Sequence, residues 1–175
     1  TTSDPWDHQV TSRIKFLKAV THPRAPILEE YCGFGPGTRV GMELAPRAIG
    51  AGAVYGTMHP AMGVAQKRWV SIYNQHRPSE GDYLNLYTLG WEPTEGHAIR
   101  KGNRMYYGFF THTPDDDYTG AVQLRGLTPQ LYRVTNYVNG RVLGDVRGPV
   151  ADLQAFFRDS LLLVAEPLPN SGDSP

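Results

Sequence analysis

The chain has 175 residues, 40% of them hydrophobic, which is enough for one large domain or two small ones with a packed core. Its 17 basic and 17 acidic side chains cancel, so the composition offers no basic field for nucleic acid and no basic amphipathic stretch for a membrane surface. Cys32 has no second cysteine to pair with, and we find no signal peptide and no membrane-spanning apolar run; together these favour a cytoplasmic location.

Two helices are predicted in the first eighty residues. The first is expected over residues 5–20, because Pro5 suits the first helical position and Val10, Ile14 and Leu17 fall on one face. The second is expected over residues 60–75.

Two short buried strands are predicted between these helices. They are "PILEEYC" at residues 26–32 and "GAVYGTM" at residues 52–58, and the stretch "MELAPRAIGA" between them is ambiguous and leaves room for a helical turn. The alternation is typical of a parallel α/β fold. Two strands and two helices cannot bury both faces of a parallel sheet, so further strands from outside the chain are expected.

The second half of the chain is predicted to be an antiparallel β-sandwich over residues 81–168, followed by a polar tail at residues 169–175. Short apolar strands recur there at regular spacing, among them "RMYYGFFT", "GAVQLRGL", "LYRVTNYV" and "SLLLVAEP". Asn139-Gly140 predicts a type I′ hairpin turn, with "RVLGDV" pairing back. The aromatic residues of this half are expected mainly in its core.

Two aspartates, Asp4 and Asp7, come just before the first predicted helix. A pair of acids at this spacing is typical of a helix cap, in which Asp4 caps the helix and Asp7 favours the positive end of its dipole. The same pair also has the carboxyl groups that acid–base catalysis requires. The residues alone leave both interpretations open.

The order of parts resembles the C-terminal portion of the melibiase-type, α-galactosidase-like retaining glycoside hydrolases. The resemblance is carried by Ser3-Asp4-Pro5-Trp6-Asp7 with Arg13 beyond it, by the segment ending in Tyr55-Gly56 and its following helix, and by "LRGLTPQLYRV" at residues 124–134. The segment "EEYCGFGPG" departs from the family pattern, which indicates a divergent subfamily.

This resemblance implies a fold class, α/β plus all-β: residues 1–80 are the last elements of a (β/α)8 barrel, and residues 81–168 are the sandwich that follows it. It implies that Asp7, with Asp4 beside it, is the catalytic acid and base for a carbohydrate substrate. The nucleophile would lie on a barrel strand that this chain does not include, so the isolated chain is expected to be inactive. No metal or cofactor is implied.

Three further residues are candidate substrate contacts. Glu29 and Glu30 end a predicted barrel strand, where barrel enzymes place their chemistry, and at most one of them can face the barrel mouth. The competing interpretation pairs them with Arg39 or Arg47. His59 follows the second predicted strand and could contact substrate, but its position favours a helix cap or a satisfied polar residue.

Two functions from different classes therefore remain. The chain is either part of a glycoside hydrolase, which works with the missing barrel portion of the same protein or with a complementary chain, or a non-catalytic sandwich module that binds carbohydrate or protein. A lone barrel fragment should expose apolar sheet edges and self-associate, so association in solution separates the two.

Overall fold

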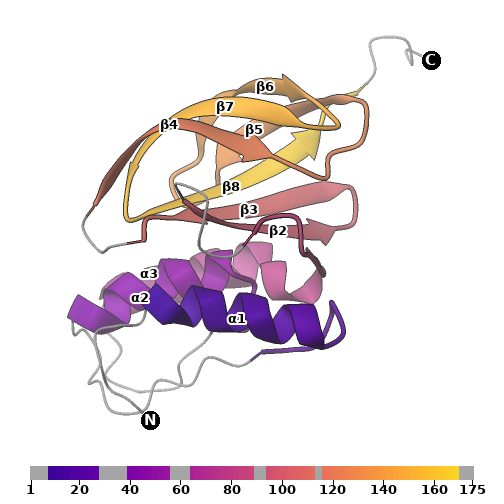
Figure 1. Cartoon of the computed structure of the whole chain (residues 1–175). Coiled ribbons are helices and arrows are strands. Elements are labelled where there is room, and N and C mark those ends of the chain that lie inside the picture. Colours follow the sequence, from indigo (N-terminus) through magenta and orange to yellow (C-terminus); the bar gives the residue numbers. More distant parts are fainter. Residues whose placement is uncertain (1–7, 28–38, 56–63, 89–93, 113–115, 170–175) are drawn as a thin grey trace.

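The fold was analysed in a computed structural model, which describes residues 8–27, 39–55, 64–88, 94–112 and 116–169. The described residues form three layers. Helices cover one face of a six-stranded antiparallel sheet, and a two-stranded sheet covers the other face (Figure 1).

The described residues of the helical layer form three α-helices. Their bounds are α1 His8–Val20, α2 Arg39–Gly50 and α3 Val64–His76, followed by the 3-10 helix η1 Pro78–Glu80. The first and third agree with the two predicted helices over the described residues. The second is a full helix where the sequence left room for a turn only. Pro46 lies inside it, yet Ala45, Ala48 and Ile49 are wholly buried, so burial outweighs the hydrogen bond that proline removes.

The buried face of α1 differs from the predicted one. Ile14 is buried, but Leu17 is 43% exposed, and the helix instead buries Thr11, Lys15 and Lys18 against the rest of the protein. The predicted stripe was therefore wrong at Leu17. Apolar spacing is a poor guide here because the buried ammonium groups find carbonyl acceptors, Lys15 in distant parts of the chain and Lys18 just beyond the helix.

In the described part of the chain eight strands follow, all paired antiparallel, and they confirm the antiparallel part of the predicted fold. The larger sheet has the order β1-β2-β3-β8-β5-β6, and β4 pairs with β7 in the smaller one. The bounds are β1 Asp82–Leu84, β2 Glu95–Lys101, β3 Arg104–Phe110, β4 Asp117–Leu124, β5 Leu131–Asn136, β6 Arg141–Arg147, β7 Ala151–Arg158 and β8 Ser160–Pro167. The sequence interpretation did not specify β2 or β7.

The turn between β5 and β6 is not type I′. Asn136 pairs with Arg141, so four residues form the loop, and within it only Gly140 has a positive φ, of 74°. A type I′ turn needs positive φ at both central residues, and Asn139 does not have it. The hairpin itself is as predicted, with the Gly140 amide donating to the Asn136 carbonyl at 2.8 Å.

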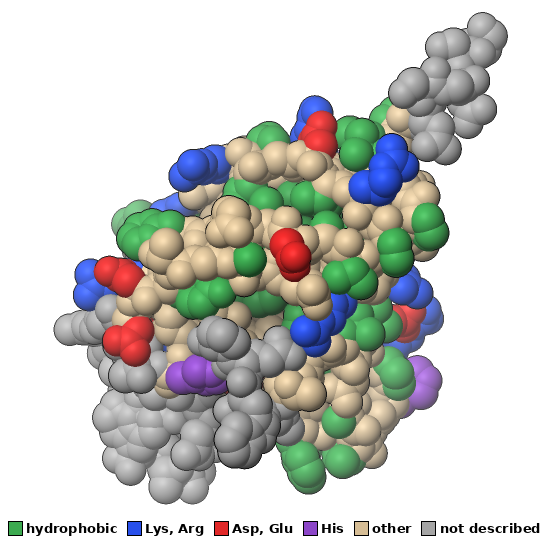
Figure 2. Space-filling model, turned by 45° about the horizontal axis from the view of Figure 1, so that its top comes forward, with side chains coloured by type: hydrophobic (Ala, Val, Ile, Leu, Met, Phe, Trp, Pro, Cys, Tyr) green, Lys and Arg blue, Asp and Glu red, His purple; other side chains and the backbone are tan. Residues whose placement is uncertain are grey.

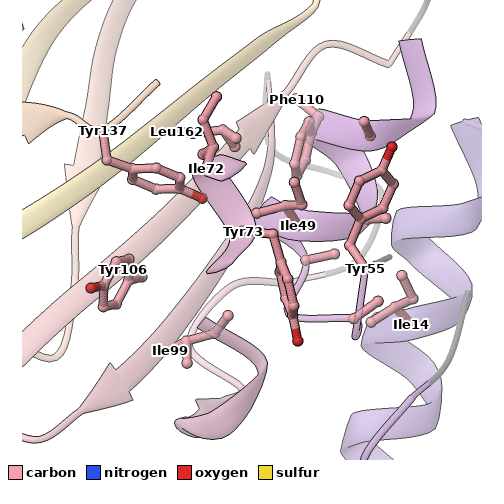
Figure 3. Packing of buried hydrophobic residues seen from close by; sticks show 14 of the residues in the cluster. Ile14, Ile49, Tyr55, Ile72, Tyr73, Ile99, Tyr106, Phe110, Tyr137 and Leu162 are labelled. Carbon is pink, nitrogen blue, oxygen red and sulfur yellow. The ribbon is translucent and has the colours of Figure 1, made fainter. Parts of the chain in front are cut away.

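The inner strands β3 and β8 of the six-stranded sheet are buried on both faces, whereas the edge strand β6 is largely exposed. Along β3 and β8 the side chains alternate between two cores: Tyr106, Phe110 and Leu162 meet the helices, while Tyr107 and Leu163 meet the smaller sheet. Figure 3 shows the first core, in which Ile14, Ile49 and Ile72 of the helices converge on the sheet. The helices and the strands therefore share one of the two cores.

The helical layer approaches the sheet most closely at two glycines. A Cβ on Gly108 of β3 would lie 2.6 Å from the carbonyl oxygen of Gly50, the last residue of α2. Just beyond, Gly52 has φ of +83°, and the Ala53 amide donates to the Ala48 carbonyl at 2.9 Å, which is the Schellman arrangement for ending a helix. Glycine at positions 50 and 108 lets the backbones meet.

The barrel part of the predicted fold remains an expectation. Of the two predicted barrel strands, residues 26–27 and 52–55 are described, and they contain a single bridge residue, Val54. In the described part of the chain, no helix is long and apolar enough to span a membrane.

Candidate functional site

All five residues predicted to form a site lie outside the described residues. Asp4 and Asp7 fall in segment 1–7, Glu29 and Glu30 in segment 28–38, and His59 in segment 56–63. Their roles therefore remain predictions. The structure describes the residues that flank these segments.

Two of the flanking points are adjacent in space. The Val54 amide donates to the Ile27 carbonyl at 2.8 Å, so the chain enters segments 28–38 and 56–63 from neighbouring positions. A third flanking point is His8, the first residue of α1, which directly follows Asp7. The hydrogen bond links the described starts of the two segments that were predicted as barrel strands.

A chain of four buried polar side chains joins α1 to the sheet. The Thr11 hydroxyl donates to Glu95 Oε2 at 3.0 Å, Glu95 Oε1 lies 2.9 Å from His97 Nε2, and His97 Nδ1 lies 2.9 Å from the Tyr83 hydroxyl. Glu95 and His97 are two residues apart on β2, so both face the helices. Thr11 and His97 are fully buried, and Glu95 and Tyr83 nearly so.

These partners determine where the protons lie. A carboxylate only accepts hydrogen bonds, so His97 donates from Nε2 to Glu95 and accepts at Nδ1 from the Tyr83 hydroxyl. Burial lowers the pKa of His97, and the hydrogen bond to Glu95 opposes that shift. Burial likewise raises the pKa of Tyr83. His97 is thus a neutral imidazole with both nitrogens bonded.

Two lysines on the same side of α1 are bonded to backbone carbonyls. Lys15, 1% exposed, donates from Nζ to the Gly96 carbonyl at 3.0 Å and to the Thr88 carbonyl at 3.2 Å. Lys18 donates to the Ala25 carbonyl at 2.6 Å, and burial lowers its pKa. Carbonyl acceptors offset the desolvation cost that would otherwise exclude an ammonium group from this layer.

A second connection joins α2 to the place where the two sheets meet. Arg47, 2% exposed, donates from Nη2 to Asp159 Oδ1 at 2.6 Å and to the Thr111 carbonyl at 3.3 Å. Its guanidinium also lies over the Phe110 ring, 5.3 Å from the centroid. Asp159 is the single residue between β7 and β8.

The Tyr83–His97–Glu95 arrangement contains the groups of a proton relay, but it is sealed. His97 is 0% exposed, so no substrate can reach its ring in this arrangement. What the chain of side chains can do is hold α1 at a fixed position on β2. The described residues hold no group of three or more His, Cys, Asp or Glu side chains that could bind a metal ion.

The sequence interpretation missed this network. The only local signal was the Glu-x-His spacing, which places two polar groups on one face of a strand. Their partner Thr11 is 84 residues away from Glu95 in the sequence, so no local pattern could pair them.

Comparison with known proteins gives one sequence relative and a set of similar folds. No protein-family model matches the chain. The chain is 28% identical over 185 aligned residues, which include 98% of the chain, to an A type blood α-D-galactosamine galactosaminidase of Flavonifractor plautii. It spans only 16% of that relative's length.

Two solved structures of a GH27 β-L-arabinopyranosidase from Geobacillus stearothermophilus have a similar fold. A variant in complex with arabinose gives a TM-score of 0.53 at 12% identity, covering 75% of this chain and 30% of that chain. The wild-type structure gives 0.51 at 10% identity, covering 76% of this chain and 31% of that one. At such identities the likeness concerns the fold alone.

The resemblance to α-galactosidase-like glycoside hydrolases, inferred from the sequence motifs, is confirmed by the sequence relative. The antiparallel sheets agree with the structural neighbours.

Proposed function

We propose that the chain is the C-terminal portion of an α-galactosidase-like retaining glycoside hydrolase and acts within a longer polypeptide or beside a complementary chain. The observation that carries the proposal is the similarity to a galactosaminidase along 98% of the chain. The likeness of fold to a glycosidase in the described region supports it. The substrate class is a glycoside, and the chain alone is inactive.

Asp7 is the proposed general acid and base. A retaining enzyme uses one carboxyl group to protonate the leaving oxygen and then to activate water, while a second carboxylate forms the glycosyl-enzyme bond. The second carboxylate lies in the part of the protein outside this chain. Asp4 assists Asp7, and Glu29 or Glu30, together with His59, contacts the sugar.

The buried polar network supports this proposal because it holds α1, the helix that follows Asp7, against the sheet. Thr11 follows Asp7 by four residues, about one helical turn, and is bonded to Glu95 of the sheet. Lys15 holds the next turn to the Gly96 and Thr88 carbonyls. The sheet thereby fixes the helix that directly follows the proposed acid.

The test uses the longer polypeptide with two variants, Asp7→Asn and Asp4→Asn, each assayed on a natural glycoside and on an aryl glycoside with a good leaving group. Removing a general acid should slow the natural substrate by roughly 10²–10⁴-fold and slow the first step of the activated one much less. Melting temperatures are measured alongside. A helix cap would instead lower stability by about 1 kcal/mol and leave both rates nearly unchanged.

The two variants also separate the roles within the pair. If only Asp4→Asn slows the natural glycoside more than the activated one, Asp4 is the general acid and the enzyme class stands. If neither variant shows this difference in rate, the two aspartates are a helix cap, and the non-catalytic binding module is favoured. Turnover of an aryl α-galactoside by the pure 175-residue chain, abolished by Asp7→Asn, would contradict the proposed division of the active site.

A further inference from the structure

Helix α1 has its polar and apolar faces reversed relative to an ordinary surface helix. Thr11, Lys15 and Lys18 are buried with Ile14 on the side toward the sheet. On the outer side, Phe16 is 58% exposed, Leu17 43% and Val20 62%. A helix that faces water normally carries polar residues there, so the exposed side of α1 does not have the composition of a water-facing surface.

Helix α3 of the same layer shows the ordinary arrangement. Ile72 and Tyr73 are buried on its inner side. Its exposed residues within the described part are mainly polar or charged: Lys67, Arg68, Ser71, Asn74 and Gln75, with Val64 at its first position. The reversal is therefore a property of α1 and not of the whole helical layer.

The exposed face of the strands also differs from α1. Figure 2 shows the side of the molecule that carries the strands, where hydrophobic side chains are interspersed with charged ones. Phe156 of β7 is 70% exposed, and its neighbours Ala155 and Phe157 are buried. Scattered exposed residues of this kind are common, whereas three on two successive turns of one helix form a patch.

The position of α1 indicates what covers this patch. Among the described helices, α2 contacts both α1 and α3 and is buried between them, so α1 lies at one end of the described row. The next element of such a layer would be another helix packed along the outer side of α1.

We propose that Phe16, Leu17 and Val20 dock an apolar helix from the part of the polypeptide outside these 175 residues. This inference rests on the proposed function, in which the chain is one portion of a longer hydrolase. The sequence relative supplies the room for such a helix, since this chain spans 16% of its length. The three side chains expose on the order of 300 Å², well below the roughly 800 Å² per partner of a stable dimer, which argues against a second copy.

The test measures how fast a thiol at the patch reacts. Cys32, the single cysteine, is replaced by serine, and Leu17→Cys is introduced into both the 175-residue chain and the longer polypeptide. A maleimide should modify Leu17→Cys freely in the short chain and about tenfold or more slowly in the longer one, because a docked helix would exclude the reagent. Phe156→Cys is the matched control and should react equally in both.

Three results would overturn the proposal. The first is equal reactivity of Leu17→Cys in the short and the long protein. The second is slow reaction in the short chain together with a discrete dimer in analytical ultracentrifugation, which would make a second copy the occupant. The third is equal slowing of Phe156→Cys, which would mean that the effect is not specific to α1. Glycosidase activity of the longer polypeptide is assayed separately. If Leu17→Cys is protected from maleimide but the polypeptide has no glycosidase activity, the docking surface is supported and the proposed enzyme function is rejected. If the polypeptide is active but Leu17→Cys is not protected, the enzyme function is supported and the docking surface is rejected.

Discussion

Arg47 of α2 and Asp159 at the β7–β8 junction form an ion pair, with Nη2 and Oδ1 2.6 Å apart, that ties all three layers together. Asp159 has φ of 63°, a left-handed conformation that aspartate, asparagine and glycine tolerate best. Its position is where the chain passes from the smaller sheet to the larger one. One residue therefore turns the chain and anchors the helical layer.

Asp159→Gly should keep the turn and remove the partner of a buried guanidinium. We expect a loss of about 3 kcal/mol in the free energy of unfolding, because Arg47 is left charged and buried. Asp159→Asn, which retains an oxygen acceptor, should lose less. Denaturant unfolding of the three proteins checks this order, and equal stability of Asp159→Gly and wild type would show that the pair contributes nothing.

Gly108→Ala should destabilise the protein by about 1–3 kcal/mol, because its new Cβ would meet the backbone of Gly50, which cannot move without shifting α2. The matched control is Gly120→Ala on β4, whose Cβ would meet only the hydroxyl end of Tyr118. Thermal melting should show a clear loss in the first variant and a small one in the second. Similar losses in both would argue against a rigid contact between α2 and β3.

Stability should fall as the pH drops below about 6.5, the ordinary pKa of histidine. Burial holds the pKa of His97 below that value in the folded protein, so the unfolded chain binds more protons in the interval between the two values. The contribution of neutral His97 to the free energy of unfolding is complete above about pH 6.5 and is lost progressively as the pH falls below that value. Burial lowers the pKa of His76 in the same direction.

The groups around His97 come from every neighbouring element. They are Tyr83 of β1, Glu95 of β2, Phe110 of β3, Lys15 of α1 and Arg47 of α2. His97→Gln should have a lower melting temperature than the wild-type protein at pH 8. Between pH 8 and pH 5.5, however, its melting temperature should fall by less than that of the wild type. His22→Gln removes an exposed imidazole and is the control. An unchanged pH dependence in His97→Gln would assign the acid sensitivity to other groups.

A chain that begins at Gly81 tests the predicted boundary between residues 80 and 81. Removing the helices would expose Ile99, Tyr106, Phe110 and Leu162, which cover the inner face of the sheet. Each buried side chain of this kind is worth about 1.5–3 kcal/mol, so we expect the shortened chain to aggregate or to melt without cooperativity. A soluble, cooperative melt would instead show that the strands fold as a separate domain.

The sequence alone determined most of the strands. The continuous apolar run "SLLLVAEP" predicted β8 with the bounds that the structure shows, and the aromatic run "RMYYGFFT" predicted β3. A short apolar run of this kind is typical of a strand buried on both faces, so it can be recognised without knowing what buries it. The family resemblance was also carried by the sequence, because it depends on residue identities along the chain.

Only the tertiary structure decided which face of α1 is buried and what accepts its cations. Lys15 bonds to the carbonyls of Thr88 and Gly96, which are 73 and 81 residues away. Helical periodicity assigns apolar residues to the interior. It fails for α1 because distant carbonyl oxygens accept hydrogen bonds from Lys15 and allow that side of the helix to be buried, so Phe16 and Leu17 lie on the exposed side. Burial of Lys15 and Thr11 depends on partners that folding brings together from 73 to 84 residues away, and no local window of sequence contains them.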